Sequence, residues 1–120
     1  MRKLLTLIFA LAMPLPAAAS EFVVVSDKAE FLSLVQDRQL RLALLSLTLL
    51  VQPDGTIKGQ ALGSEVTGTW AWQDGYFCRQ MAWNGKNVPY NCQLVEVRDA
   101  SSMRFTVDQG KGDSAVFQLR

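Results

Sequence analysis

The sequence predicts a mainly β domain (α+β): an antiparallel meander of about seven strands that forms a curved sheet or open barrel, with one N-terminal helix. Three observations predict this fold class. Turn-forming residues interrupt the chain about every 8 to 12 residues from residue 53 onward, which is typical of an antiparallel meander. A single helix start signal precedes them. The length of 120 residues suits one domain.

The N-terminus has the pattern of an export signal. Two basic residues precede the apolar run Leu4–Leu11, and three small alanines, ending at Ala19, follow it. The pattern predicts a signal peptide over residues 1–20, cleaved near Ala19, which leaves residues 21–120 as a single β-rich domain in the periplasm or outside the cell. A permanent N-terminal anchor is the alternative, but the apolar run is far shorter than the roughly 20 residues of a spanning helix.

One helix is expected near the start of the mature chain. Asp27 and Glu30 fit the reciprocal capping box, in which an acidic N-cap is followed three residues later by glutamate. One helical face then carries the apolar side chains of Phe31, Leu34 and Val35. We therefore expect a helix over about residues 27–37.

Residues 39–51 are predicted as one long strand. Their leucines lie on even positions up to Leu44 and on odd positions from Leu45 onward, and this change of parity indicates a β-bulge between the two sets. The alternative is an amphipathic helix, because leucine is a good helix former.

Six further strands follow, separated by turns such as Asp74–Gly75 and Asn84–Gly85. A sheet of about seven strands with one helix is expected to curl, with the helix covering one end or one open edge. The six predicted strands are residues 56–62, 66–72, 76–83, 92–98, 103–108 and 115–119.

The composition excludes several classes of function. The chain has no histidine, which rules out Ser-His-Asp and Cys-His catalytic units and imidazole metal sites. Its 12 basic and 11 acidic residues give no strongly basic surface for nucleic acid. Most acids lie in turns or in the helix, and no spacing pairs the exceptions, Glu65, Glu96 and Asp108, for hydrolysis. We therefore expect no catalytic residue, cofactor or metal, and no membrane span in the mature chain.

The two cysteines are expected to form a disulfide. Cys78 and Cys92 lie on consecutive predicted strands, and a hairpin that pairs them is centred on residue 85, within the Asn84–Gly85 turn. An exported chain meets an oxidising compartment, which favours a structural bridge. The alternative, a redox-active pair, lacks the CxxC spacing that lowers a thiol pKa.

Arg79 is the unusual residue of this hairpin. If Cys78 and Cys92 share one face of the sheet, then Arg79 lies on the other face, in apolar surroundings. A guanidinium in that position needs a partner. The partner is a structural carboxylate such as Glu65 or Asp108, or an anionic ligand, unless the side chain reaches solvent.

Aromatic residues gather in the same region. Six of them crowd into about 20 residues, and Gly68 beside them would leave room for a ring. Core packing is the favoured interpretation, and the lining of a pocket or partner-binding face is the alternative. The candidate ligand-binding residues are Trp70, Trp72, Arg79 and Trp83.

The run Val66–Trp70 resembles the Gly-x-Trp strand that opens lipocalin and avidin-type barrels. The resemblance covers five residues and implies a barrel-like fold with a cavity.

A second resemblance covers most of the mature chain and includes the segments Gly68–Trp72, Asp74–Arg79, Asn91–Gln93, Arg104–Thr106 and Gly112–Ala115. They are similar to a group of small exported bacterial proteins of unknown role, often labelled dihydrodipicolinate reductase. That label would imply NAD(P)H-dependent reduction. Because the chain has no glycine-rich strand-to-helix turn and no histidine, no reductase residue can be carried over to it.

Two classes of function remain. The first is an exported binding or interaction module for a small anionic or amphipathic ligand, or for a partner protein. The second is a structural or inhibitory envelope protein that acts through loops such as residues 84–91.

Overall fold

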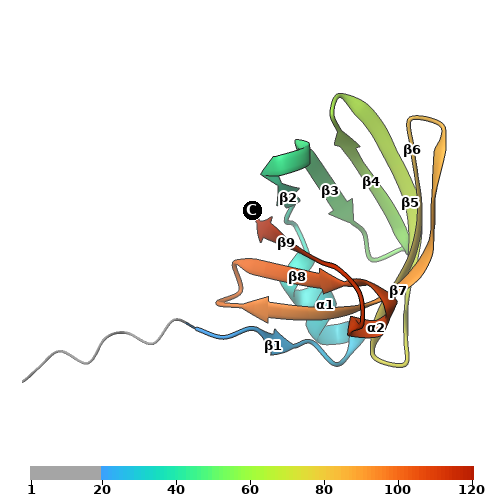
Figure 1. Ribbon diagram of the computed structural model, residues 1–120. Helices are drawn as coiled ribbons and strands as arrows, with labels where there is room; N and C mark the ends of the chain where they lie inside the picture. The colour runs from blue at the N-terminus through green and yellow to red at the C-terminus, as the bar shows by residue number, and fades with distance from the viewer. Residues whose placement is uncertain (1–19) are drawn as a thin grey trace, which may run out of the picture.

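The computed structural model describes residues 20–120 as a closed antiparallel barrel of eight strands with one additional strand and one helix of eight residues (Figure 1). The mainly β class predicted from the sequence is confirmed. The predicted signal peptide lies outside the described residues, apart from Ser20.

The barrel is a meander in which each strand pairs with the next. Closure comes from the pairing of the first and last barrel strands, with Leu40 opposite Leu119. A short strand β1 (Val23–Val24) adds to the outside of the ring by pairing with β7. The barrel strands are β2 (Leu40–Leu42), β3 (Leu47–Val51), β4 (Thr56–Ala61), β5 (Ser64–Gln73), β6 (Tyr76–Trp83), β7 (Lys86–Arg98), β8 (Ser102–Thr106) and β9 (Ser114–Leu119).

β2 and β3 replace the single long strand that the sequence predicted over residues 39–51. A 3-10 turn, η1 (Ala43–Leu45), reverses the chain between them, with Ser46 in the left-handed region at φ 45°. The expected bulge is therefore wrong, although the change of parity was real. Because the reversal separates the two sets, even-numbered Leu42 and odd-numbered Leu47 both face the interior. It also raises the barrel from seven predicted strands to eight.

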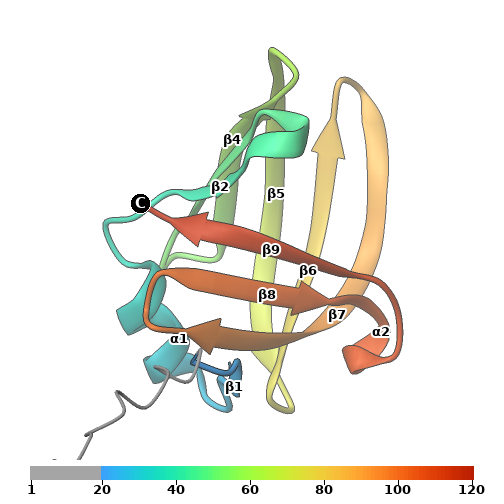
Figure 2. The same ribbon diagram turned by 60° about the vertical axis from the view of Figure 1, so that its left-hand side comes forward.

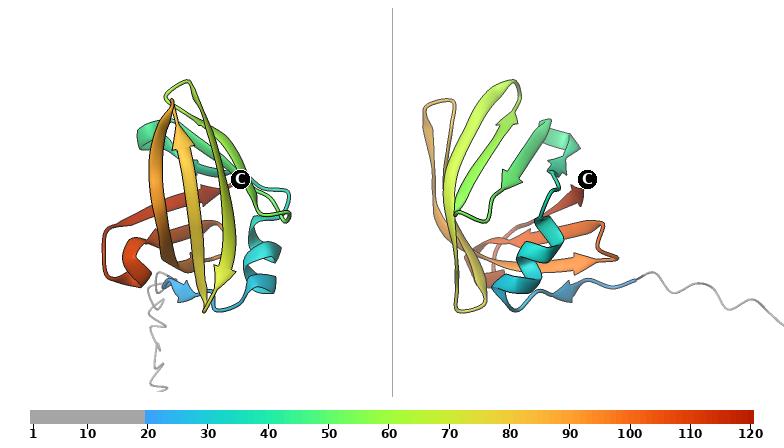
Figure 3. Two further views of the ribbon diagram at one scale, coloured as in Figure 1. Left: turned by 90° about the vertical axis from the view of Figure 1, so that its right-hand side faces the viewer. Right: turned by 180° about the vertical axis from the view of Figure 1, so that it is seen from behind.

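Helix α1 (Lys28–Val35) covers one end of the barrel (Figure 2). Its start agrees with half of the predicted reciprocal capping box, since the Asp27 carboxylate accepts a hydrogen bond from the Glu30 amide at 2.8 Å. The helix ends at Val35, two residues before the predicted end. Phe31 and Val35 are fully buried on its inner face. The views from the side and from behind show α1 lying against the strands at this end (Figure 3).

β7 is long because two barrel strands, β6 and β8, pair with different parts of it. Residues Lys86–Gln93 pair with β6, and Leu94–Arg98 pair with β8. A bulge interrupts the first half, where two residues, Pro89 and Tyr90, stand opposite Gln80 alone. A bulge suits Pro89, since proline cannot donate a ladder hydrogen bond.

Gly68 allows two strands to approach closely. A Cβ atom at this position would overlap the carbonyl oxygen of Gln80 and the side chain of Met81 on β6. The glycine therefore makes room for the backbone of the neighbouring strand, whereas the sequence suggested room for a ring.

Candidate functional site

The barrel interior contains an apolar cavity of about 290 Å³. Its walls are mainly aliphatic and aromatic side chains from β2, β3, β6, β8 and β9, among them Leu42, Leu47, Met81 and Phe105. The cavity reaches the end of the barrel that α1 does not cover, where Leu45 of η1 lines it, and it extends inward to Phe77, whose ring contacts Phe31 of α1. Four polar side chains share the lining: Arg79, Gln93, Asp113 and Ser114.

Arg79 carries the positive charge of this cavity. It lies on β6 between Phe77 and Met81, and its side chain is half-buried. Burial lowers the pKa of Arg79, since removal of water disfavours the charged form. The group keeps its charge at neutral pH, because the ordinary pKa of an arginine lies far above neutrality.

The bulge in β7 supplies a partner for the guanidinium. Its Nη1 donates a hydrogen bond to the carbonyl oxygen of Pro89 at 2.6 Å. Among the described residues, the only ion pair joins Arg104 and Glu96, so Arg79 pairs with neither Glu65 nor Asp108, the carboxylates suggested from the sequence. Arg79 therefore presents a cation without an ion-pair partner to a largely apolar cavity, whose lining also includes the Asp113 carboxylate.

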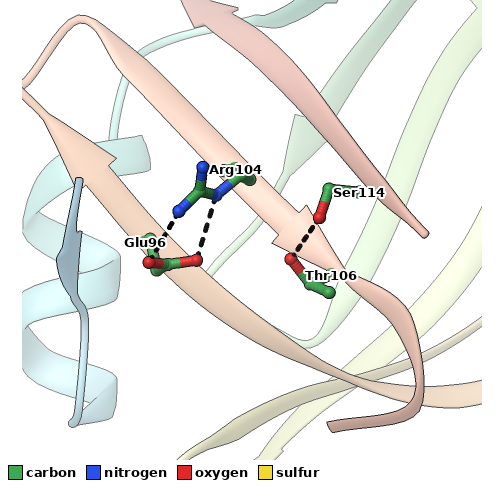
Figure 4. Close-up of polar contacts among 4 residues, drawn as sticks. All are labelled: Glu96, Arg104, Thr106 and Ser114. Atoms are coloured by element: carbon green, nitrogen blue, oxygen red, sulfur yellow. Dashed lines mark hydrogen bonds and ion pairs between the residues drawn. The ribbon is translucent and has the colours of Figure 1, made fainter. Parts of the chain in front are cut away.

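The other polar groups lie at different points of the wall. Gln93 is a buried residue on β7. Ser114, at the start of β9, shares a hydrogen bond of 2.7 Å with the hydroxyl of Thr106 on β8 (Figure 4). These groups add hydrogen-bonding capacity to a lining that is otherwise apolar.

Trp70 and Trp72, two of the candidate ligand-binding residues, pack in the core beneath α1. The Phe31 ring lies 5.4 Å from that of Trp70 and 5.1 Å from that of Trp72, between ring centroids. The indole of Trp70 donates to the carbonyl of Gln52 at 2.8 Å. Trp70 is the cross-strand neighbour of Arg79, but neither tryptophan lines the cavity.

Trp83 is the last residue of β6. Its indole donates to the carbonyl of Ala61 at 2.8 Å, and the half-buried ring packs against the edge of the core. Of the four candidate ligand-binding residues, the structure places Arg79 alone in the cavity wall.

The disulfide holds the hairpin that carries Arg79. Cys78 and Cys92 are bonded and lie directly opposite each other, with their Cα atoms 3.9 Å apart. This confirms the predicted bridge. The register differs near the turn, where Trp83 lies opposite Lys86, and the bulge in β7 shifts it by one residue so that Cys78 meets Cys92. The hydroxyl of Tyr90 lies 3.3 Å from the Cys92 sulfur. A disulfide is typical of a protein in a non-reducing environment.

A second charged cluster, formed by Glu96, Arg98 and Arg104, joins β1 to the barrel. Two hydrogen bonds of 2.9 and 3.0 Å connect Arg104 on β8 to the Glu96 carboxylate on β7 (Figure 4). These hydrogen bonds raise the pKa of Arg104 above its ordinary value. The Phe22 ring lies 4.5 Å from the guanidinium carbon of Arg98 and 4.2 Å from that of Arg104. Glu96 and Arg104 neutralise each other in an ion pair, and Arg98 packs over the Phe22 ring next to β1.

The sequence reasoning missed most of the cavity wall. The wall residues that it missed include the leucines of β2 and β3 and the polar residues Gln93, Asp113 and Ser114. The change of leucine parity at Leu44–Leu45 was the available signal. A bulge and a chain reversal produce the same parity pattern, and only the pairing of Leu42 with Leu47 distinguishes them.

These features define a small antiparallel β-barrel with an apolar cavity and one interior cation. Comparisons with protein-family models, with curated proteins and with solved structures found no match for the chain. Within residues 20–120, no helix is long and apolar enough to cross a membrane. The same part of the chain contains no cluster of three or more Cys, Asp or Glu side chains placed to hold a metal ion.

Proposed function

We propose that the protein is an exported binding protein that holds a small amphipathic anion inside its barrel. The anionic head would pair with Arg79, and the apolar tail would fill the cavity between β2, β3 and β9. The observation that carries the proposal is the half-buried guanidinium in a largely apolar cavity, where it forms no ion pair with any described carboxylate, including Asp113 of the same lining.

The energetics of the guanidinium support this proposal. An arginine removed from water without an opposite charge destabilises a fold, and the single carbonyl of Pro89 compensates only part of that loss. A carboxylate would accept two parallel hydrogen bonds from the guanidinium fork. Such a ligand would therefore satisfy the donors that the folded chain leaves available.

The cavity volume limits the size of the ligand. A volume of about 290 Å³ is at the small end of ligand pockets. At about 30 Å³ for each non-hydrogen atom, it holds roughly ten such atoms. Octanoate, with one carboxylate and a short acyl chain, is a ligand of this size and chemistry.

A titration with octanoate tests the proposal. We expect the mature protein to bind octanoate, and we expect Arg79→Met to bind it about 10 to 100 times more weakly, because charge-assisted hydrogen bonds are lost while the apolar volume is kept. Octanol is the matched control ligand, and its affinity is expected to be similar for both proteins. Equal affinity of both proteins for octanoate would contradict the proposal.

Native mass spectrometry addresses the natural ligand and export together. The protein is purified from the periplasm of its own host beside the Arg79→Ala variant. We expect a chain that starts near Ser20 or Glu21 and carries an extra mass that the variant lacks. The leader pattern of residues 1–20 and the disulfide support this expectation. A chain that retains its leader would contradict export, and an unliganded chain in both samples would favour a partner protein instead.

A further inference from the structure

Three exposed leucines surround one side of the open end of the barrel. Leu44 is 88% exposed, Leu62 60% and Leu45 44%. Leu44 and Leu45 belong to η1, while Leu62 lies in the turn between β4 and β5. The two turns touch, since the Leu62 amide donates to the Leu45 carbonyl at 3.3 Å. Figure 2 shows both turns at the same end of the molecule. We call these three residues the leucine rim.

A cationic hollow lies beside the leucine rim. It has a volume of about 410 Å³, and its lining includes Arg41, Arg120 and the polar residues Ser46 and Thr48. No aspartate or glutamate side chain lines it. Ala43 and Ser46, which flank the rim leucines in η1, also belong to its wall, so apolar and cationic groups share one edge of the barrel.

The size of the rim decides what kind of surface it fits. A stable protein–protein interface buries about 800 Å² on each partner, which three leucine side chains on two protruding turns do not supply. A lipid bilayer needs no complementary shape. It accepts protruding apolar side chains below the head groups and places cations at the level of the lipid phosphates.

We propose that the open end of the barrel docks on an anionic lipid bilayer. Leu44, Leu45 and Leu62 enter the acyl boundary, and Arg41 and Arg120 bind lipid phosphates in the cationic hollow. Leu45 also lines the cavity, so docking would point the cavity toward the membrane. This inference is independent of the proposed ligand, because it depends on the rim and the hollow and not on Arg79.

Co-sedimentation of the mature protein with vesicles tests the inference. We expect binding to phosphatidylcholine vesicles that contain phosphatidylglycerol, and weaker binding to phosphatidylcholine alone. Leu44→Ser and Leu62→Ser should each lower the partition coefficient about tenfold, because each removes an inserted apolar side chain. Arg41→Gln should lower binding to the anionic vesicles only. Leu50→Ser is the matched control, since Leu50 on β3 is 39% exposed outside the rim.

Three results would overturn the inference: no binding to anionic vesicles, an equal loss of binding in Leu50→Ser, or a dimer in solution that Leu44→Ser converts to monomer. The last result would assign the rim to a second copy of the chain. No octanoate is present in this assay, and no lipid is present in the octanoate titration, so each proposal can fail without the other.

Discussion

At the residue scale, Arg79 illustrates how a single side chain sets the chemistry of a small barrel. Strand alternation next to the bonded Cys78 directs Arg79 to the interior, where the neighbouring wall is apolar. The bulge at Pro89 turns one carbonyl oxygen toward the guanidinium, which leaves the remaining donors for another acceptor. The charge is therefore retained inside the barrel without an ion pair.

Asp54 makes a residue-scale prediction about acid stability. Its carboxylate accepts hydrogen bonds from the Thr56 hydroxyl at 2.6 Å and from the Thr56 amide at 3.0 Å, and these bonds lower the pKa of Asp54. The unfolded chain therefore takes up the proton first as the pH falls. The carboxylate stabilises the fold above its ordinary pKa of 3.8, and this contribution is lost as the pH falls through the lower folded value.

We expect Asp54→Ala to lose stability at neutral pH and to approach the wild type as the pH falls below the lowered folded pKa of Asp54, where both lack the charged carboxylate. Urea unfolding midpoints across this pH range provide the measurement. Asp74→Ala, another turn aspartate, serves as the comparison for a general effect of removing a charge. A gap between Asp54→Ala and wild type that stays constant with pH would show that the carboxylate charge contributes nothing.

At the element scale, α1 closes one end of the barrel through a single aromatic residue. The Phe31 ring contacts Trp70, Trp72 and Phe77, each with ring centroids 5.1 to 5.4 Å apart. Isolated helices of eight residues are unstable in water, so this packing and the Asp27 cap stabilise α1. The tryptophans of β5 therefore serve the helix interface.

Phe31→Ala is expected to destabilise the fold by about 3 to 5 kcal/mol, because the substitution leaves a cavity among three rings. Asp27→Ala should cost about 1 kcal/mol through loss of the N-cap. Ser33→Ala, on the exposed side of α1, should change stability by less than about 0.5 kcal/mol. Urea denaturation measures all three. A Phe31→Ala cost as small as that of Ser33→Ala would mean that α1 does not close the barrel.

At the scale of the whole molecule, the barrel depends on contacts between neighbours in sequence and on one closing pair. All strand pairs from β2 to β9 join consecutive strands, except the β2–β9 pair that closes the ring. The Cys78–Cys92 bridge, with a sequence separation of 14, reinforces the β6–β7 hairpin within this meander. The bridge therefore stabilises a hairpin that the pairing already specifies.

Removal of the disulfide is expected to lower stability by about 3 kcal/mol without loss of the barrel. Wild type with and without reductant is compared with the Cys78→Ala/Cys92→Ala variant by urea denaturation, and circular dichroism reports the β content. Reductant should not affect the variant, which controls for effects unrelated to the bridge. An unchanged urea midpoint after reduction would show that the disulfide does not stabilise the fold. Loss of β content in the variant would show that the barrel needs the disulfide to form.

The local features of this protein were determined by the sequence itself. The N-cap at Asp27, the Asn84–Gly85 turn and the spacing of Cys78 and Cys92 act over short stretches of chain. The helix start, the hairpin turn and the disulfide agree with them, whereas the bulge that aligns the two cysteines was not predicted. The same alternation places Arg79 on the face opposite Cys78, because successive side chains of a strand point to opposite faces. Only the closed barrel makes that face the interior.

Only the tertiary structure decided the closure of the barrel, the split of residues 39–51 into a hairpin and the surroundings of Arg79. Each depends on contacts between segments far apart in the chain. Leu40 pairs with Leu119, and residues of β3 and β9 line the same cavity. Periodicity records which face of a strand is apolar. It does not record which strand lies across the interior. The distance between strands in space determines whether an inward arginine forms an ion pair or faces mainly apolar side chains.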